Sequence, residues 1–171
     1  MAKGDNFPAQ GEVDSTTRIN VRILTEEDAL DYFRLAQENR AQLDNGDIHV
    51  PWDLDDMLRK IKYPRPEGRE DYGIWEDNQL VGGIDFIPQG PKRAQIVYWV
   101  DKDHQGKGIA KEAVRGMVEY AFGMPGITEL RAWVKEGNVA SQRTLKANGF
   151  IHVDSNRGDE FLGFSLEKPD S

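Results

Sequence analysis

Cysteine is absent from this chain of 171 residues, and its absence excludes several kinds of chemistry. No disulfide framework can form, no thiolate can hold a metal ion, and no cysteine can act as a nucleophile. Long apolar runs are missing as well, because no stretch approaches the roughly 20 residues that cross a bilayer. The N-terminal segment lacks the apolar centre of a secretory signal peptide. We therefore expect a cytoplasmic protein with no membrane partner.

Positive charge is also scarce. Lys and Arg number 22 against 30 Asp and Glu, which gives a net charge of −8. Proteins that bind nucleic acid ordinarily present a basic face, so this balance argues against a nucleic-acid partner. The excess of acid suits a cationic small molecule or a basic peptide, but solubility alone is the preferred explanation.

Motifs for metal binding and hydrolysis are missing too. No histidine stands in an H-x-x-x-H or H-x-x-E pairing, and the run DLDD lacks the glycine and distal glutamate of a calcium loop. No G-x-S-x-G string marks a serine hydrolase. The three isolated histidines are His49, His104 and His152. The sequence therefore predicts a site without a metal ion.

The order of periodic segments predicts a single α/β domain with a mixed central sheet flanked by helices. Residues 1–17 are polar and rich in small side chains, so we expect a flexible N-terminal leader before a domain at 18–168. Alternating or β-branched stretches predict strands at 18–24, 71–75, 80–87, 94–101, 127–135, 150–153 and 160–166. Helical spacing and capping residues predict helices at 25–39, 53–62, 106–122 and 138–148.

What the chain does have is a glycine turn between a strand and a helix, in the string DHQGKGIAKEAV. The strands at 94–101 and 127–135 and the helix between them predict a parallel crossover, in which ligands bind beyond the carboxyl end of the first strand. Gly106 and Gly108 let the backbone approach a phosphate, and the helix dipole favours an anion there. The turn lacks the third glycine of the dinucleotide fingerprint and is not a Walker loop. A tight turn without a ligand is the alternative.

The glycine turn and two later strings together resemble the GNAT superfamily of N-acetyltransferases, and within it the ribosomal-protein N-acetyltransferase (RimJ/RimL-like) group. The strings are IVYWVDKDHQGKGIAKEAV, ITELRAWVKEGN and NVASQRTLKANGF, and they cover about residues 94–150. The order of elements extends the resemblance to about residues 18–167. These motifs indicate the superfamily but do not identify the acceptor.

The resemblance implies a GNAT-like fold whose central sheet is splayed between the strands near 94–101 and 127–135, with acetyl-CoA as co-substrate in the gap. The pyrophosphate would rest on the glycine turn, and the pantetheine arm would pair with the strand edge, where splayed strands leave amide groups to be satisfied. Locally, Asn138 is also explained as a helix cap and Ser141 as a surface serine. The implied cofactor-binding residues are Tyr98, Trp99, Val100, Gln105, Gly106, Lys107, Gly108, Ile109, Ala110, Asn138 and Ser141.

Acetyl transfer to an amine requires a base for the amine proton, a donor for the developing oxyanion and a proton for the departing thiolate. A backbone N–H near Val100 is the expected oxyanion donor. The tyrosine that many members of the family use as proton donor corresponds to Leu145 here, and this departure shifts the role to Ser141. Asp85 and Glu160 are the candidate bases. Ile84 and Phe86 should point to the opposite face of their strand, so we expect Asp85 to face the cleft, and Glu160 starts the last strand. For each of them a solvated surface carboxylate is the alternative.

The sequence therefore predicts an acetyl-CoA-dependent N-acetyltransferase that works by direct attack in a ternary complex, because no cysteine can carry the acetyl group. The acceptor is a primary amine, either a protein N-terminus or a cationic small molecule. We expect it to enter beside Asp44, Asp47 and Trp52, with Trp52 itself in the core. We expect a monomer or homodimer. The alternative is a non-catalytic acyl-CoA sensor or interaction module, which the residue at position 145 favours.

Overall fold

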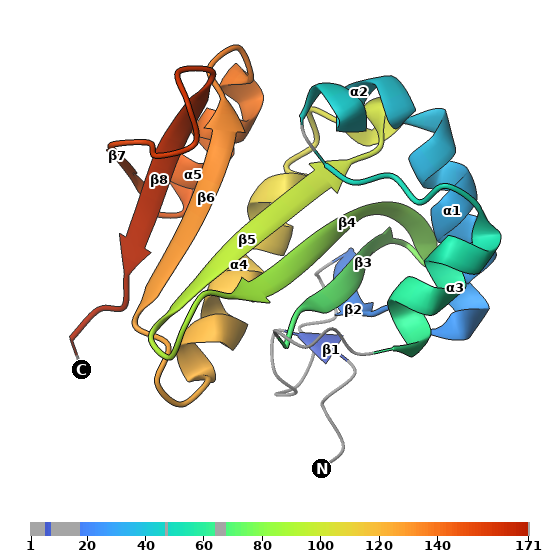
Figure 1. The fold of residues 1–171 in the computed structure, drawn as a ribbon, viewed down its shortest axis with the longest axis horizontal. Coiled ribbons are helices and arrows are strands. Elements are labelled where there is room, and N and C mark those ends of the chain that lie inside the picture. The colour runs from blue at the N-terminus through green and yellow to red at the C-terminus, as the bar shows by residue number, and fades with distance from the viewer. Residues whose placement is uncertain (1–5, 8–17, 47, 64–67, 171) are drawn as a thin grey trace.

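The computed structural model describes residues 6–7, 18–46, 48–63 and 68–170 (Figure 1). Every strand and helix expected from the sequence is present within a few residues of its predicted bounds. The strands are β1 (Asn6–Phe7), β2 (Ile19–Ile23), β3 (Glu70–Glu76), β4 (Gln79–Pro88), β5 (Arg93–Val100), β6 (Glu129–Lys135), β7 (Ile151–Val153) and β8 (Phe161–Glu167). The helices are α1 (Ala29–Glu38), α2 (Arg40–Asn45), α3 (Leu54–Lys62), α4 (Ile109–Gly123) and α5 (Val139–Ala147), with 3₁₀ turns at Glu26–Asp28 and Lys102–His104.

The flexible leader expected at residues 1–17 falls mostly outside the described residues. Within it, Asn6 and Phe7 form β1, which is antiparallel to β2. In the part of the chain that the structure describes, no helix is both long enough and apolar enough to span a bilayer.

The described strands form one mixed sheet in the order β1-β2-β3-β4-β5-β6-β8-β7. Neighbouring strands are antiparallel except for β5 and β6, which are parallel and are connected through α4, as the sequence predicted. Two parallel strands need such a crossover, because the chain must return to the same end of the sheet before the second strand begins. This crossover places the glycine turn directly after β5.

The sheet opens at its centre. β5 and β6 pair only where residues 93–95 lie opposite residues 129–131. Beyond that point the two strands diverge (Figure 1), while β5 stays paired with β4 as far as Val100 and β6 stays paired with β8 as far as Lys135. The predicted splay is therefore confirmed.

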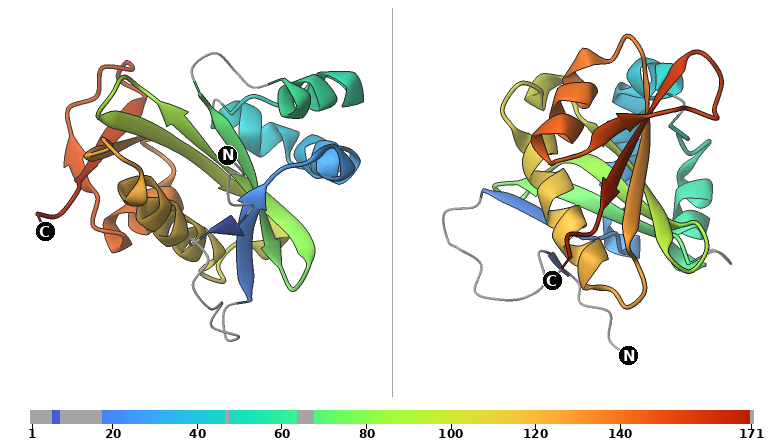
Figure 2. Two further views of the ribbon diagram at one scale, coloured as in Figure 1. Left: turned by 90° about the horizontal axis from the view of Figure 1, so that it is seen from below. Right: turned by 90° about the vertical axis from the view of Figure 1, so that its left-hand side faces the viewer.

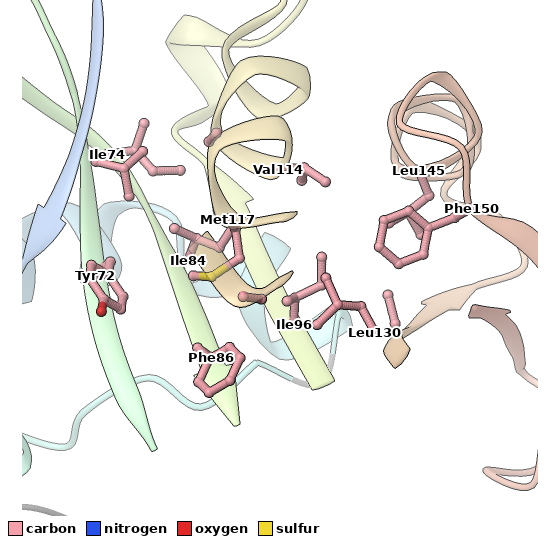
Figure 3. Packing of buried hydrophobic residues seen from close by; sticks show 14 of the residues in the cluster. Tyr72, Ile74, Ile84, Phe86, Ile96, Val114, Met117, Leu130, Leu145 and Phe150 are labelled. Atoms are coloured by element: carbon pink, nitrogen blue, oxygen red, sulfur yellow. The ribbon is translucent and has the colours of Figure 1, made fainter. Parts of the chain in front are cut away.

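Helices cover both faces of the sheet, each over a separate apolar core (Figure 2). On one face α4 packs through Met117 against Ile84 and Ile96, and further along Leu145 and Phe150 meet the β6 side of the same core (Figure 3). Buried residues recur along α4 at intervals of three or four, which is the spacing of a helix with one apolar side. On the other face α1, α2 and α3 cover the β3–β5 side of the sheet.

The break between α1 and α2 depends on a buried polar side chain that the sequence did not single out. Asn39 is 2% exposed, and its amide nitrogen donates to Asp101 Oδ1 at 2.7 Å and to the Leu35 carbonyl oxygen at 2.9 Å. Its amide oxygen accepts from the backbone N–H of Lys102 at 2.9 Å. These bonds tie the first helices to the segment that leads from β5 into the glycine turn. No helix was expected from the sequence where α2 forms, because this anchoring is a tertiary contact.

Candidate active site

A cleft of about 960 Å³ fills the opening between β5 and β6. Its walls come from the second half of β5, the end of β6, the first turn of α4, one side of α5 and the end of α2. Of the predicted cofactor-binding residues, the ones that line it are Tyr98, Trp99, Val100, Gln105, Gly106, Gly108, Ile109, Ala110, Asn138 and Ser141. Lys107, in the turn itself, is outside the lining.

The edge of β5 directs backbone groups into the cleft. The N–H of Asp101 donates to the carbonyl oxygen of Val81 on the β4 side, at 2.7 Å. Because backbone groups alternate in direction along a strand, the amide groups of Tyr98 and the N–H of Val100 point the other way, toward the cleft. An extended ligand with amide groups can pair with such an edge as an added strand does.

The glycine turn has the geometry of an anion cradle. Gly106 and Gly108 have φ values of 78° and 80°, and Gly108 is the residue that immediately precedes α4. No atom lies within 4 Å of the place that a Cβ would occupy at either glycine, so it is backbone conformation, and not crowding, that requires glycine here. The amides that begin α4 therefore open toward the cleft with room for a bulky anion.

The charged side chains along the cleft are basic, although the chain as a whole is acidic. Lys111 on α4, Lys135 on β6 and Arg143 on α5 line it, and among the described residues no Asp or Glu does. A basic cleft in a chain of net charge −8 is suited to a ligand that carries several phosphates. Helical spacing alone places Lys111 on the solvent side of α4, so the sequence did not reveal this role.

Two hydroxyl groups meet inside the cleft. The Tyr98 hydroxyl lies 2.7 Å from Ser141 Oγ and 3.2 Å from the Ser141 carbonyl oxygen. Asn138 Oδ1 accepts from the Ser141 N–H at 3.1 Å, so the prediction that Asn138 caps α5 is confirmed. Burial raises the pKa of Tyr98, although its hydrogen bond to Ser141 acts in the opposite direction. The phenol therefore stays protonated at neutral pH and can donate to the serine.

Leu145, at the position of the family's tyrosine, does not face the cleft. Its side chain is fully buried and lies beside Phe150, on the β6 side of the core (Figure 3). Tyr98 places a phenolic hydroxyl in the cleft from a different element, β5. The sequence analysis named Tyr98 for its backbone groups and did not predict a role for its hydroxyl. Tyr98 and Ser141 are 43 positions apart in the sequence, and only the fold brings their hydroxyl groups together.

Asp85 does not reach the cleft. Ile84 and Phe86 point into the core under α4, so Asp85 points to the other face of β4, as predicted. That face lies beneath α1 and α3, where Asp85 is 6% exposed and is not part of the cleft lining. The expectation that it faces the cleft is corrected by this helix layer, which strand alternation cannot reveal.

Asp85 belongs instead to a buried group of four charged side chains. Arg69 donates to Asp85 and, through Nε, to Asp71 Oδ1 at 3.1 Å, while Lys60 Nζ lies 3.5 Å from Asp71. Asp71 is also the cross-strand neighbour of Asp85. Burial raises the pKa of Asp85 to about 6, and the charge of Asp71 acts in the same direction against those of Lys60 and Arg69.

The second candidate base and the described residues of the predicted acceptor entrance are not part of the cleft lining either. The Glu160 side chain is 80% exposed and lies 3.9 Å from Lys135 Nζ. Trp52 is 80% exposed, so the expectation that it belongs to the core is wrong: the loop before α3 carries it into solvent. Asp44 is exposed on α2 but does not line the cleft, and Asp47 lies outside the described residues.

One titratable pair at the cleft was missed by the sequence analysis. His104 lines the cleft, and its Nδ1 lies 2.7 Å from Asp101 Oδ2. Burial acts to raise the pKa of Asp101, but hydrogen bonds from Asn39 and His104 hold it below its usual value. A charged Asp101 accepts from Nδ1–H and leaves Nε2 of the neutral ring as a proton acceptor. Among the described residues, His104 is the only histidine that lines the cleft.

These features define a class of protein: a single domain whose mixed sheet opens between two parallel strands, over a glycine turn at the start of a helix. The family model described as "Acetyltransferase (GNAT) domain" matches residues 18–151. The chain belongs to this family, as the resemblance in its motifs indicated.

Curated relatives match about half of the chain. A Bacillus subtilis protein named as a probable N-acetyltransferase, YjcK, is 39% identical over 93 residues, which are 50% of this chain and 51% of that protein. The ribosomal-protein-serine acetyltransferase of Escherichia coli is 34% identical over 94 residues, covering 52% and 51% of the two chains. The chain thus spans about half the length of these relatives.

A solved structure confirms the fold over nearly the whole chain. A ribosomal-protein alpha-N-acetyltransferase, RimL, in complex with coenzyme A has a TM-score of 0.76 and 19% identity, and the match covers 90% of this chain and 96% of that one. At this identity the likeness establishes the fold alone.

Proposed function

We propose that the chain is an N-acetyltransferase that moves an acetyl group from acetyl-CoA to a primary amine. The observation that carries this proposal is the basic cleft in the opened sheet, which joins a glycine turn, a free strand edge and a pair of hydroxyl groups. Coenzyme A has a matching part for each: phosphates, an arm with two amide groups, and a sulfur. The related N-acetyltransferases and the structural neighbour that holds coenzyme A support this assignment.

Each part of the cleft can be matched to a part of acetyl-CoA, beginning with its phosphates. The amides of Gly106 and Gly108 and the positive end of α4 would hold the pyrophosphate, with Lys111 and Arg143 as the basic side chains of the same cleft. The edge of β5 at Tyr98 would pair with the amide arm. The thioester would then lie beside the hydroxyl pair.

The protein groups available for catalysis suggest a direct transfer. His104, acting through water, takes a proton from the acceptor amine, whose nitrogen then forms a bond to the acetyl carbon. The backbone N–H of Val100 stabilises the negative charge on the carbonyl oxygen. The carbon–sulfur bond breaks, and Ser141 donates its proton to the sulfur while Tyr98 holds the serine oxygen by a hydrogen bond. The proton that His104 took from the amine then returns to the serine through water, so that both groups are restored. The roles of Asp85 and Glu160 as bases have no support in the geometry.

Acetyl-CoA binding is the first test, by calorimetric titration with NAD and ATP as controls. We expect micromolar binding of acetyl-CoA alone. Gly108→Ala should weaken it about tenfold, because a non-glycine residue at positive φ costs on the order of 1–2 kcal/mol. Gly123→Ala is the matched control, because Gly123 lies at the other end of α4 outside the cleft and its φ is not positive. Equal affinities in the two variants would contradict the proposal that the turn binds the phosphates of acetyl-CoA.

Thiol release in the presence of an amine panel then separates catalysis from binding. An acetyltransferase releases one thiol for each amine acetylated, whereas an acyl-CoA sensor binds the ligand and releases none. The panel should contain peptides with free N-termini and small amines, since the protein N-terminus and the small molecule remain alternative acceptors. Binding without thiol release across the whole panel would favour the sensor.

A further inference from the structure

A second hollow, of about 250 Å³, lies on the sheet next to the cleft and is rich in arginine. Three of its seven lining residues are arginines, and no Asp or Glu is among them. The lining consists of Gln89, Arg93, Gln95, Arg131, Trp133, Asn156 and Arg157. A concentration of guanidinium groups in a chain of net charge −8 calls for a ligand of opposite charge.

Two of the arginines are held in place by one carboxylate behind them. Arg93 Nε and Arg131 Nε donate to the two oxygens of Glu129 at 2.7 and 2.6 Å, and Ser165 Oγ donates to the same carboxylate at 2.9 Å. Burial acts to raise the pKa of Glu129, but these three hydrogen bonds hold it below its usual value. One carboxylate therefore orients two guanidinium groups and neutralises one of them. Each is fixed through Nε, and its two amino groups remain for a further acceptor.

The third arginine closes the hollow from the loop between β7 and β8. Arg157 stacks with its guanidinium carbon 5.5 Å from the centre of the Trp133 ring and 5.7 Å from that of Phe161. Stacking on the two aromatic rings orients the planar guanidinium group and adds a third positive charge to the hollow.

The hollow adjoins the cleft at Trp133, which lines both. Arg131 and Trp133 are two residues apart on β6, so their side chains project from the same face at a spacing of about 7 Å. Residue 131 is also the last residue of β6 that pairs with β5. Arg131 thus lies at the point where the two strands begin to diverge. Figure 1 shows the divergence of the strands.

We propose that this hollow is a subsite for an anionic group on the acceptor, so that the preferred substrate is a primary amine that also carries a carboxylate or a phosphate. Arg93 and Arg131 bind the anion by charge-assisted hydrogen bonds, Arg157 adds its positive charge beside them, and the amine reaches past Trp133 toward the cleft. This inference rests on the proposed acetyl transfer. The net charge of the chain suggested a cationic acceptor, whereas the arginines of this hollow favour an acceptor that carries an anionic group.

Matched acceptors provide the test. One pair is a short peptide amide with a free N-terminus and glutamate in its second or third position, against the same peptide with glutamine. The other is phosphoethanolamine against ethanolamine. We expect kcat/KM to favour the anionic member of at least one pair by about tenfold to a hundredfold, which is the range of a few charge-assisted hydrogen bonds. The pair that shows the preference identifies the carboxylate or the phosphate as the natural group.

Arginine variants locate the preference. In Arg131→Gln and, separately, Arg157→Gln, the ratio of kcat/KM between the anionic and neutral members should fall toward one, and Arg131→Lys should restore part of it. Arg157 lies on a loop, so its variant covers the case in which Arg131→Gln fails to fold. Arg115→Gln is the control, because Arg115 is an exposed arginine on α4 outside both hollows, and the ratio should stay at the parent value. A parent enzyme without preference, or a preference that survives in both Gln variants, overturns the proposal.

The subsite can be tested even if no amine is acetylated. Calorimetric titration of the glutamate and glutamine peptides into the protein loaded with CoA measures binding alone. Tighter binding of the glutamate peptide that is lost in Arg131→Gln would support the anionic subsite while the proposed catalysis fails. Equal binding of the two peptides would overturn the subsite whatever the outcome for catalysis.

Discussion

Three side chains at the cleft have a geometry suited to moving protons. Ser141 and Tyr98 place two hydroxyl groups 2.7 Å apart, and His104 is oriented by a buried carboxylate. The two carboxylates expected as bases are poorly placed, because Asp85 is buried under the helices on the other face of the sheet and Glu160 is in solvent. At the scale of single residues, the structure therefore moves the expected base from a carboxylate to an imidazole.

His104→Gln should lower kcat/KM about a hundredfold, because general acid–base catalysis contributes on the order of 10²–10⁴-fold. The variant should also change the pH dependence of kcat/KM, because the group that accepts the amine proton is removed. Initial rates measured from pH 5.5 to 9 check this. Asp85→Asn, measured in parallel, should retain the pH dependence of the parent. Loss of that dependence in Asp85→Asn alone would return the role of base to Asp85.

Removal of either hydroxyl should slow departure of the thiol. We expect Ser141→Ala to lower kcat about a hundredfold and Tyr98→Phe to lower it about tenfold, because Tyr98 acts through the serine. The affinity for acetyl-CoA should change less than threefold in both, since neither hydroxyl contacts the phosphate end of the cleft. Steady-state rates with calorimetry measure both quantities. A larger loss of kcat in Tyr98→Phe than in Ser141→Ala would make Tyr98 the direct donor.

At the scale of elements, the cleft depends on how α2 and the end of β5 are joined. Gln42 on α2 and Gln105 in the turn both donate to the Val100 carbonyl oxygen at 3.0 Å, and they also bond to each other at 2.7 Å. Asn39 adds its bonds to Asp101 and Lys102. Side chains from three segments thus satisfy the backbone where β5 ends, and they orient the glycine turn relative to the strand edge.

Asn39→Ala should lower the free energy of unfolding by about 2–3 kcal/mol, because it leaves a buried carboxylate and a backbone N–H without their partner. It should also weaken acetyl-CoA binding, since the turn loses an anchor. Urea unfolding and calorimetry measure the two effects. Asn20→Ala, on the exposed side of β2, is the control and should stay within about 0.5 kcal/mol. A parent-like affinity in Asn39→Ala would show that the turn is oriented without this contact.

At the scale of the whole molecule, charge is distributed unevenly. The chain carries −8 overall, yet both hollows are lined by basic side chains and the buried group under α1 and α3 combines two acids with two bases. Net charge consequently says little about either binding surface. The buried group bears on stability, because Asp85 gains a proton more readily in the folded chain than in the unfolded one.

The stability of the fold should therefore depend on pH through Asp85. Its pKa is about 6 when folded, against an ordinary value of 3.8, so the stability that its proton contributes is fully present below about pH 4 and is lost as pH rises through 6. Asp85→Asn stays neutral throughout. Relative to the parent, its free energy of unfolding should rise by up to about 3 kcal/mol between pH 4 and pH 7. Urea unfolding over that range measures the difference, and a constant difference would contradict the raised pKa.

The sequence by itself determined the order of elements, the parallel crossover, the glycine turn after β5 and the cap at Asn138, because each depends on spacing within a few residues. Motif resemblance added the splay between β5 and β6 and the place of Ser141. Only the tertiary structure decided which side chains reach the cleft. Alternation predicts that Asp85 points away from one core, but not that α1 and α3 cover the other face. The pairs Tyr98–Ser141 and Asn39–Asp101 join residues 43 and 62 positions apart, and such contacts leave no periodic signal in the sequence.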